Sequence, residues 1–320
     1  MSFAVIIPAR MHSTRLPNKP LMDIAGKPMV VRVAERAALS GASRVAVATD
    51  HDDIVKACTE NGIEAVLTKE THPTGTDRLS EAATLMGLAD DTIVVNVQGD
   101  EPLIPPEVVG RVAKTLEEAP DCAIATATHP IETLESFLNP NVVKVELDGT
   151  NRAMTFSRAP IPWPRDAFKD GQKALPQGFT ALHHIGIYAY RVAFLKRFPA
   201  LTRAPIEAAE SLEQLRAMWH GYKIAVTVLS ANLPAGVDTA EDLERVRRLW
   251  PLRKTHFPSK RPPVMSGRFC CGRLTGSTRG HYRQLSGTHG TPWTGTPSRC
   301  RKMKGTERTT LTTLLRAAKA

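Results

Sequence analysis

Short apolar runs alternate with amphipathic segments along the first 130 residues. The runs at 3–7 and 92–97 are continuous and rich in β-branched residues, which is typical of strands buried on both faces of a parallel sheet. The segment 29–39 repeats apolar residues with helical spacing and stops at Gly41, as a helix should. Such alternation predicts a mostly parallel sheet with crossover helices. The other elements predicted here are strands at 44–48, 65–67 and 123–127 and helices at 52–60, 77–86 and 107–118.

The pattern changes after residue 140. Apolar positions at 142–147 and 152–156 predict a hairpin, and a proline-rich segment follows at 157–180. The remaining predicted elements are strands at 185–190 and 223–229 and helices at 205–219 and 239–249. Neither a helical nor a strand period continues beyond them, so the folded domain is predicted to span residues 1–250.

Charge separates this domain from the rest of the chain. The net charge of +10 arises in residues 251–320, which hold 15 Lys or Arg and one acid, Glu307, whereas residues 1–250 hold 27 Lys or Arg and 31 acids. The tail is rich in Gly, Pro, Ser, Thr and Arg, and so few apolar groups predict disorder. Its abrupt start favours an out-of-frame or other accidental extension. The alternative is a basic tail that binds nucleic acid.

Composition limits the class of protein. With 42% hydrophobic and 23% charged residues, the chain is expected to be soluble and globular. No stretch approaches the ~18 apolar residues that a membrane helix needs, and the apolar N-terminus breaks at Pro8 and Arg10 before it could form a signal-peptide core. The five cysteines lack any C-x-x-C spacing, which argues against disulfides and a structural zinc site. We therefore expect a cytoplasmic protein.

A basic loop follows the first predicted strand. It carries Arg10, Arg15 and Lys19 beside the hydroxyls of Ser13 and Thr14. Ligands bind at the carboxyl ends of parallel strands, and arginine forks grip phosphate oxygens in pairs. The loop is neither a Walker A motif nor a G-x-G-x-x-G turn. It favours a polyphosphate site, with a solvated basic loop as the alternative.

A pair of acids, Asp100 and Glu101, follows the strand at 92–97, with Gly99 allowing the turn. A carboxylate in this position is a natural ligand for Mg²⁺, which one or two carboxylates and substrate phosphates usually hold. Asp238 is a candidate for the second carboxylate. It also lies one residue before a helix with a capping box, so its alternative role is helix capping. Spacing alone cannot bring Asp238 to Asp100.

Two further groups of residues are candidates for binding. His183 and His184 are adjacent, but neighbouring strand residues face opposite sides, so a pocket or interface is favoured over a shared metal ion. The segment 75–78 begins a predicted helix, whose free N–H groups favour an anionic or carbonyl-bearing ligand. The alternative there is a capped helix.

Together these motifs resemble the 3-deoxy-manno-octulosonate (Kdo) cytidylyltransferase family, also called CMP-Kdo synthetases. The resemblance covers residues 2 to about 250 and implies a three-layer αβα, Rossmann-like nucleotide-diphospho-sugar transferase fold with a mostly parallel mixed sheet. The first loop also resembles sialic acid synthetases, so the later motifs are more specific. The motifs are 8–10, 13–17 and 19–21 in the loop, then 96–102, 156–163, 184–188, 212–216, 236–239 and 241–244.

The resemblance implies the reaction of CTP with Kdo to give CMP-Kdo and pyrophosphate, for lipopolysaccharide biosynthesis. The anomeric hydroxyl would attack the α-phosphate directly with the help of Mg²⁺ as cofactor. A homodimer is implied as well, and the apolar strand at 185–190 could serve it, whereas no membrane partner is expected and nucleic acid is disfavoured. The alternative within the superfamily is CMP transfer to another acidic sugar, a sialic acid or an 8-amino analogue of Kdo.

The resemblance also implies roles for single residues. Lys19, Arg10 and Asp100 would be catalytic, and Asp100 and Asp238 would hold the metal. The expected CTP contacts are Pro8, Ala9, Arg10, Ser13, Arg15, Lys19, Gly75 and Thr76. The expected Kdo contacts are Arg78, Gln98, Arg158, His184, Tyr188, Glu213 and Gln214. One departure is His183, where the family often has an arginine.

Overall fold

The structure, a computed structural model, describes residues 2–12, 16–230 and 233–250. The chain separates into two units, Met1–Phe257 and Pro258–Ala320, and every described residue belongs to the first. The predicted contacts Ser13 and Arg15 and the predicted tail lie outside the described residues.

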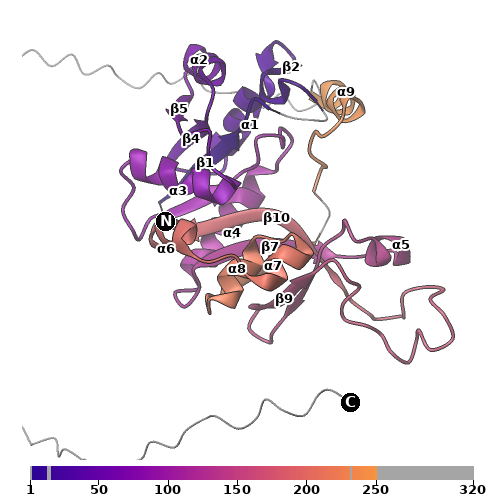
Figure 1. Cartoon of the computed structure of the whole chain (residues 1–320). Helices are drawn as coiled ribbons and strands as arrows, with labels where there is room; N and C mark the ends of the chain where they lie inside the picture. The colour runs from indigo at the N-terminus through magenta and orange to yellow at the C-terminus, as the bar shows by residue number, and fades with distance from the viewer. Residues whose placement is uncertain (1, 13–15, 231–232, 251–320) are drawn as a thin grey trace, which may run out of the picture. The chain divides into compact units, whose positions relative to one another are not determined.

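A nine-stranded mixed sheet forms the centre of the described part of the first unit (Figure 1). Its main path runs β11-β7-β10-β6-β1-β4-β5, with β8 and β9 attached to β10 as a hairpin. All strands of this path except β10 run parallel to one another. The strands are β1 (Phe3–Ala9), β4 (Arg44–Thr49), β5 (Glu64–Leu67), β6 (Ile93–Asn96), β7 (Ile124–Pro130), β8 (Lys144–Leu147), β9 (Ala153–Ser157), β10 (Leu182–Arg191) and β11 (Ile224–Val228), with β2 (Asp23–Ile24) and β3 (Lys27–Pro28) as a separate pair.

Helices cover both faces of the sheet, which confirms the predicted three-layer α/β fold. Alternation along β1 decides the sides, because Val5 and Ile7 face one hydrophobic cluster while Ala4 and Ile6 face the other. The first face is covered by α1 (Met29–Ala38), α2 (Asp52–Glu60), α4 (Pro106–Glu117) and α9 (Ala240–Leu249). The second is covered by α3 (Gly75–Leu85), α6 (Val192–Arg197), η2 (Phe198–Ala200) and the pair α7 (Pro205–Glu210) and α8 (Gln214–Trp219).

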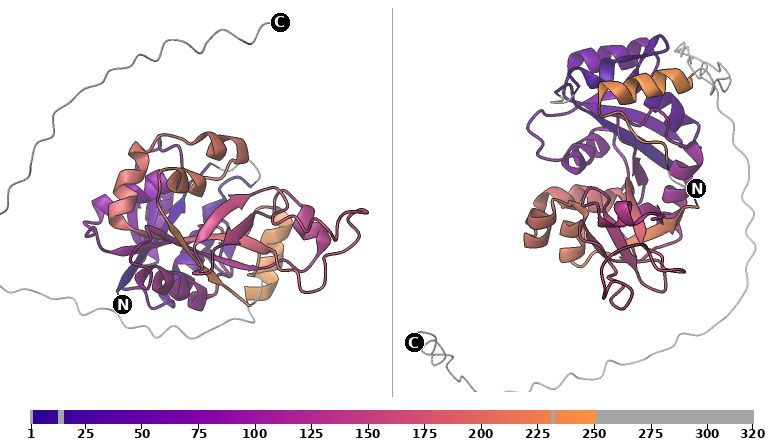
Figure 2. Two further views of the ribbon diagram at one scale, coloured as in Figure 1. Left: turned by 90° about the horizontal axis from the view of Figure 1, so that it is seen from below. Right: turned by 90° about the vertical axis from the view of Figure 1, so that its right-hand side faces the viewer.

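Two distant segments of the sequence meet at α9. This helix, drawn in orange, lies beside the first elements of the chain in both views (Figures 1 and 2). Arg247 Nε donates to the carbonyl of Asp23 at 2.9 Å, and the Arg32 guanidinium lies 5.0 Å from the Trp250 ring centroid. The end of the described chain therefore packs against elements that follow the first strand.

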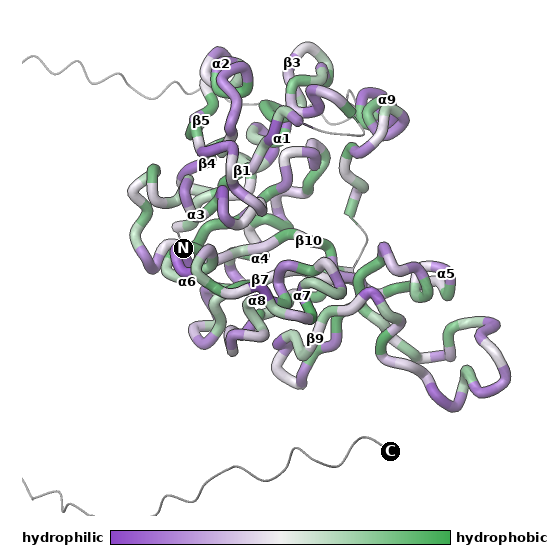
Figure 3. The backbone as a smooth tube through the Cα atoms, viewed as in Figure 1, coloured by the Kyte–Doolittle hydropathy of each residue, from purple (hydrophilic) through white to green (hydrophobic). Residues whose placement is uncertain are grey.

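An extension between β7 and β10 has a small core of its own. Ile131, Phe137, Phe168 and Ala181 pack together there, around α5 (Leu134–Leu138). The extension mixes hydrophilic and hydrophobic residues along its length (Figure 3). It contains the proline-rich segment predicted at 157–180.

The predicted elements need correction in two places. The helix predicted over 205–219 is two helices, because Ser211 adopts a left-handed conformation (φ 51°) that ends α7 and turns the chain so that Leu212 is buried. The sequence pattern also did not predict α5 and α6. The strand expected to serve a dimer, 185–190, lies in β10, where residues 188–190 pair with β6 on one side and with β7 on the other.

Within the described ranges, no helix is both long and apolar enough to cross a membrane.

Candidate active site

The chain reverses its direction across the sheet between β1 and β6. From β1 it passes to β4 and β5, and then returns to β6 on the other side of β1. Such a switch point leaves a crevice at the carboxyl ends of the two strands, and ligands bind there in open α/β sheets. The basic loop after β1 and the acidic loop after β6 both begin at this crevice.

The two loops approach so closely that only glycine fits between them. A Cβ atom on Gly99 would lie 2.8 Å from the carbonyl oxygen of Pro8, closer than real Cβ contacts allow. Pro8 is half-buried near the end of β1, and Ala9 beside it is 4% exposed. Gly99 thus sets the distance between the predicted phosphate loop and Asp100.

Lys19 links the two predicted metal ligands. Its Nζ donates to Asp100 Oδ2 at 2.6 Å and to Asp238 Oδ1 at 3.1 Å. The lysine side chain is 14% exposed, whereas those of Asp100 and Asp238 are 35% and 48% exposed. The three groups, far apart in the sequence, meet at one point that solvent can reach.

A backbone contact brings Asp238 to this point. The Val237 N–H donates to the carbonyl of Asp100 at 2.8 Å, and a Cβ on Gly236 would lie 3.1 Å from the same oxygen. Helix α9 is capped by Thr239 and Asp242 instead of Asp238. The N–H of Asp238 helps to lower the pKa of the Asp242 carboxyl to about 2. The alternative role of Asp238 as a helix cap is therefore wrong, and its carboxylate faces Lys19.

The donor set at this point fits a divalent cation. Among the described residues no group of three or more His, Cys, Asp or Glu could hold a metal ion, so any metal here would rely on Asp100, Asp238, water and a ligand. Two converging, solvent-accessible carboxylates match the way in which Mg²⁺ is held beside phosphates. Neighbouring Glu101 differs, because burial and then the charge of Asp100 raise its pKa to about 8.

The basic loop also contacts the segment before α3. Arg10 Nη2 donates to the carbonyl of His72 at 2.8 Å, and His72 Nε2 lies 2.5 Å from Glu81 Oε2. Helix α3 begins with a capping box between Thr74 and Asp77, so the capped-helix alternative holds for its first N–H groups. Thr76 is buried, and its hydroxyl donates to Glu213. A predicted CTP contact is thereby joined to a predicted sugar contact, and Gly75 lies directly before it.

The imidazole of His184 is fixed in one tautomer. The Thr126 hydroxyl donates its proton to the carbonyl of Ile187 at 2.6 Å, so it accepts from His184 Nε2 at 2.9 Å. Burial lowers the pKa of His184 to about 3, which keeps the ring neutral and leaves Nδ1 as an acceptor. The ring packs against Phe156 and Tyr188. Burial also raises the pKa of Tyr188, whose hydroxyl therefore stays protonated.

His183 faces the other side of the strand, as predicted. His129 Nδ1 donates to the carbonyl of Pro130 at 2.8 Å, so its Nε2 accepts from His183 Nδ1 at 2.9 Å. Burial lowers the pKa of His183 to about 4. The two adjacent histidines thus belong to different hydrogen-bond networks.

Three buried polar atoms on the face of the sheet that carries His184 have no hydrogen-bond partner among the described residues, and one of them is Arg78 Nε. Gln214 Nε2, at the start of α8, is a donor, and Asn96 Oδ1, at the end of β6, is an acceptor. Asn96 lies opposite Tyr188 in the sheet register, and Gln98 follows two residues later. Buried unsatisfied groups of this kind are costly unless a ligand completes them. Asn96 is not among the residues predicted for the site, although its position at the start of the motif 96–102 was a signal.

The structure uses two of the predicted arginines differently. Arg158 lies at the end of β9, and its Nη2 makes no hydrogen bond to a described residue. Arg78 is fully buried, where its guanidinium donates to Asp50 and, at 2.7 Å, to Thr68. Both terminal nitrogens of Arg78 are thus engaged inside the protein, whereas its Nε is buried without a partner among the described residues.

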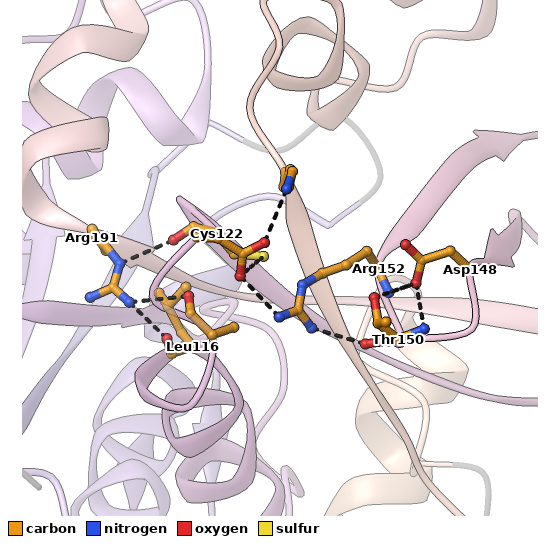
Figure 4. A network of polar contacts seen from close by, with 9 residues as sticks. Leu116, Cys122, Asp148, Thr150, Arg152 and Arg191 are labelled. Carbon is orange, nitrogen blue, oxygen red and sulfur yellow. Dashed lines mark hydrogen bonds and ion pairs between the residues drawn. The ribbon is translucent and has the colours of Figure 1, made fainter.

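The opposite edge of the sheet carries a different polar network (Figure 4). Asp121 Oδ1 accepts from Arg152 at 3.0 Å, and Oδ2 accepts from Lys223 at 3.2 Å. The Arg152 bond and then the Lys223 bond lower the pKa of Asp121 to about 2. Beside it, Arg191 donates to three backbone carbonyls, those of Leu116, Ala119 and Cys122.

Comparison with known proteins shows a match to one family and similarity to solved structures. The model of the cytidylyltransferase family matches residues 4–224. The structure of CMP:2-keto-3-deoxy-manno-octonic acid synthetase complexed with CTP is 40% identical, with a TM-score of 0.71 over 78% of this chain and 99% of that chain. HddC from Yersinia pseudotuberculosis complexed with GMP-PN is 15% identical, with a TM-score of 0.53 over 78% of this chain and 99% of that chain, a likeness of fold alone.

Proposed function

Because this chain belongs to the cytidylyltransferase family and is a nucleotidyltransferase, we propose that it transfers CMP from CTP to Kdo and releases pyrophosphate. The observation that carries the proposal is the meeting of Lys19, Asp100 and Asp238 at the switch point of the sheet. The 40% identity to a CMP:2-keto-3-deoxy-manno-octonic acid synthetase supports Kdo as the sugar. The product would supply lipopolysaccharide biosynthesis, and we place the reaction in the cytoplasm.

In this proposal Asp100 and Asp238 hold Mg²⁺ beside the triphosphate. Mg²⁺ would neutralise phosphate charge, polarise the α-phosphorus and favour deprotonation of the attacking hydroxyl. Lys19 holds the two carboxylates together and turns its ammonium toward phosphate oxygens when the nucleotide binds. Arg10 binds the outer phosphates, and the loop containing Ser13 and Arg15 completes the nucleotide site with Pro8 and Ala9. Gly75 and Thr76 lie on the side of the base or ribose.

The sugar acid lies on the face of the sheet that carries His184. Its carboxylate binds the free corner of the Arg158 guanidinium, since arginine forks match carboxylates. His184 Nδ1 accepts from a sugar hydroxyl, while Gln98, Tyr188, Glu213 and Gln214 supply further contacts. The anomeric hydroxyl attacks the α-phosphorus, and the bond to pyrophosphate breaks. Positioning and charge neutralisation provide the catalysis, so no protein nucleophile is used.

A substrate panel tests this proposal. The purified chain is incubated with CTP, Mg²⁺ and Kdo, an 8-amino analogue of Kdo, or a sialic acid, and pyrophosphate release is measured. We expect kcat/KM for Kdo to exceed that for either other sugar by about 100-fold, because a site that pairs with each polar group rejects substrates that leave those groups unpaired. A strong preference for another sugar acid would contradict Kdo as the substrate. Omission of Mg²⁺ should abolish release with every sugar.

We also propose that residues 1–250 form the complete cytidylyltransferase domain and that it forms a homodimer. The family match, residues 4–224, lies within this range, as does every site residue named above. A chain truncated after Trp250 should keep its kcat/KM within about twofold, because every residue proposed for the site lies within residues 1–250. Loss of activity or solubility on truncation would assign the tail to the fold. Light scattering of the truncated chain tests the dimer.

A further inference from the structure

Three hydrogen bonds join Glu210, the last residue of α7, to the end of β9. The Ser157 hydroxyl donates to Glu210 Oε1 at 2.7 Å, and the Arg158 N–H donates to Oε2 at 2.9 Å. Arg158 Nε donates to the backbone carbonyl of Glu210 at 2.7 Å. Both carboxylate oxygens are therefore used, and the main chain of the same residue orients the guanidinium.

A buried lysine holds Arg158 from the other side. Lys144 is fully buried, and its Nζ donates to three backbone carbonyls, those of Asn139 at 3.0 Å, Val142 at 2.6 Å and Arg158 at 2.9 Å. Arg158 Nη1 donates to the carbonyl of Pro140 at 3.0 Å. The backbone N–H and carbonyl of Arg158, its Nε and its Nη1 are thus all engaged. Only Nη2 lacks a partner among the described residues, so one corner of the guanidinium is presented in a fixed orientation.

Glu210 also sits directly before the corner that carries two other sugar-site candidates. The chain turns at Ser211, and Glu213 and Gln214 follow. Arg216 in α8 donates to both carboxylate oxygens of Glu207 in α7, at 2.9 and 2.6 Å, so the corner is held independently of Glu210. Loss of the Glu210 contacts would therefore free Arg158 from the corner without separating the two helices.

We infer that Glu210 is a positioning residue for the sugar-acid substrate. It touches no substrate atom, but it fixes the distance between Arg158, which meets the sugar carboxylate, and Glu213 and Gln214, which meet the rest of the sugar. This inference rests on the proposed function, because it requires a carboxylate-bearing acceptor. Glu210 thus lies outside the direct contacts of the site. Its carboxylate offers two acceptors, one to a hydroxyl and one to an N–H, and an amide cannot replace both.

Kinetics of Glu210 variants test the inference. In Glu210→Ala we expect the KM for the sugar acid to rise about tenfold or more, since charged hydrogen bonds are lost, while the KM for CTP stays within about twofold. Glu210→Gln should show a similar KM split, and Glu210→Asp should restore part of the sugar affinity. Ser157→Ala should give a smaller rise, and the double variant with Glu210→Ala should be less than additive. Glu107→Gln, on the exposed side of α4, is the matched control and should match the parent.

An equal rise in both KM values, or an unchanged KM for the sugar acid in a folded Glu210→Ala variant, would overturn the positioning role. Hydrogen exchange gives a readout that does not depend on the substrate. Amides at 157–159 and 211–214 should exchange faster in Glu210→Ala than in the parent, and unchanged exchange would also overturn the inference. A parent that releases no pyrophosphate with any sugar acid would instead contradict the proposed function.

Discussion

Two charge clusters lie at opposite ends of the parallel strands of the central sheet, and their arrangements of charge are opposite. At the carboxyl ends of β1 and β6 one cation, Lys19, lies between two carboxylates, whereas at the opposite edge one carboxylate, Asp121, lies between Arg152 and Lys223. Exposure does not separate them, because the Asp238 and Asp121 side chains are 48% and 44% exposed. A surface charge cluster is therefore no indication of function by itself.

The two clusters differ in the contacts that bring their charged groups together. Lys19 and Asp238 reach Asp100 only because of close backbone approaches at Gly99 and Gly236, which place polar groups at a switch point. In the opposite cluster Asp121 accepts from both Arg152 and Lys223, and Arg191 satisfies backbone carbonyls at the end of α4 (Figure 4). The first cluster therefore leaves two solvent-accessible carboxylates beside a lysine at the switch point, whereas the groups of the second cluster pair with the chain's own charges and carbonyls.

The largest effect should come from Asp100→Asn. We expect kcat/KM to fall more than about 100-fold, because a neutral amide binds Mg²⁺ weakly and no longer balances Lys19. The melting temperature should stay near that of the parent, since Asp100 is partly exposed. The matched variant at the other edge, Asp121→Asn, should keep kcat/KM within about twofold. Near-normal activity of Asp100→Asn would refute its role as a metal ligand.

Gly99→Ala should weaken the nucleotide site. Its Cβ would approach the Pro8 carbonyl to 2.8 Å, so the two loops must move apart. We expect the KM for CTP to rise about tenfold, a loss typical of a site misplaced by a fraction of an ångström. Gly149→Ala is the control, because nothing lies within 4 Å of its added Cβ. Equal CTP affinity in both variants would show that loop spacing does not set the site.

Arg152→Met should lower stability and leave catalysis intact. The variant loses the bonds to Asp121 and to the carbonyl of Thr150, each 3.0 Å long. Since the ion pair is partly exposed, we expect the melting temperature to fall by no more than a few degrees, with the KM for CTP unchanged. Calorimetry and the pyrophosphate assay check the two parts. A large loss of activity would mean that the two edges are coupled.

Lowering the pH should first reduce the stability of the fold through protonation of His184. Its pKa is about 3 in the folded state, against an ordinary value of 6.5, so the unfolded chain binds the extra proton. Stability is therefore full above about pH 6.5 and is lost as the pH falls toward 3, by up to about 1.4 kcal/mol per pH unit for this group. The Asp121 carboxyl, with a pKa of about 2, adds to this loss of stability only when the pH falls below its ordinary value of 3.8.

Urea unfolding between pH 4 and 7 measures this dependence. His184→Phe should flatten the slope by one proton, because Phe cannot be protonated. His183, with a pKa of about 4, continues to contribute in both proteins. An unchanged slope in the variant would contradict the neutral, buried state of His184.

Much of the fold could be predicted from hydrophobic patterning. The buried strands and most helices of the alternating part lie within a few residues of their predicted positions, since burial on both faces of a parallel sheet leaves a continuous apolar run. The division at Ser211 could not be predicted in this way. A left-handed residue leaves no trace in periodicity, and the helical spacing on either side continues across it.

The site could be predicted only in part. Charge and position after a strand made Lys19, Asp100 and Asp238 candidates, and the resemblance assigned the metal role to the two aspartates. No local pattern shows that Val237 hydrogen-bonds to Asp100, because the two residues are far apart in the sequence and their contact follows from the tertiary fold. The buried state of Arg78 was not visible either, since its partners Asp50 and Thr68 lie on neighbouring loops. Tertiary contacts decided these cases.

A crystal structure of the chain with CTP and Mg²⁺ is the most direct test of the site at the first edge of the sheet. We expect a metal ion bound at about 2.1 Å by oxygens of Asp100, Asp238 and the triphosphate, with the Lys19 ammonium on a phosphate oxygen. A triphosphate bound away from this crevice, or a metal ion that contacts neither carboxylate, would contradict the assignment.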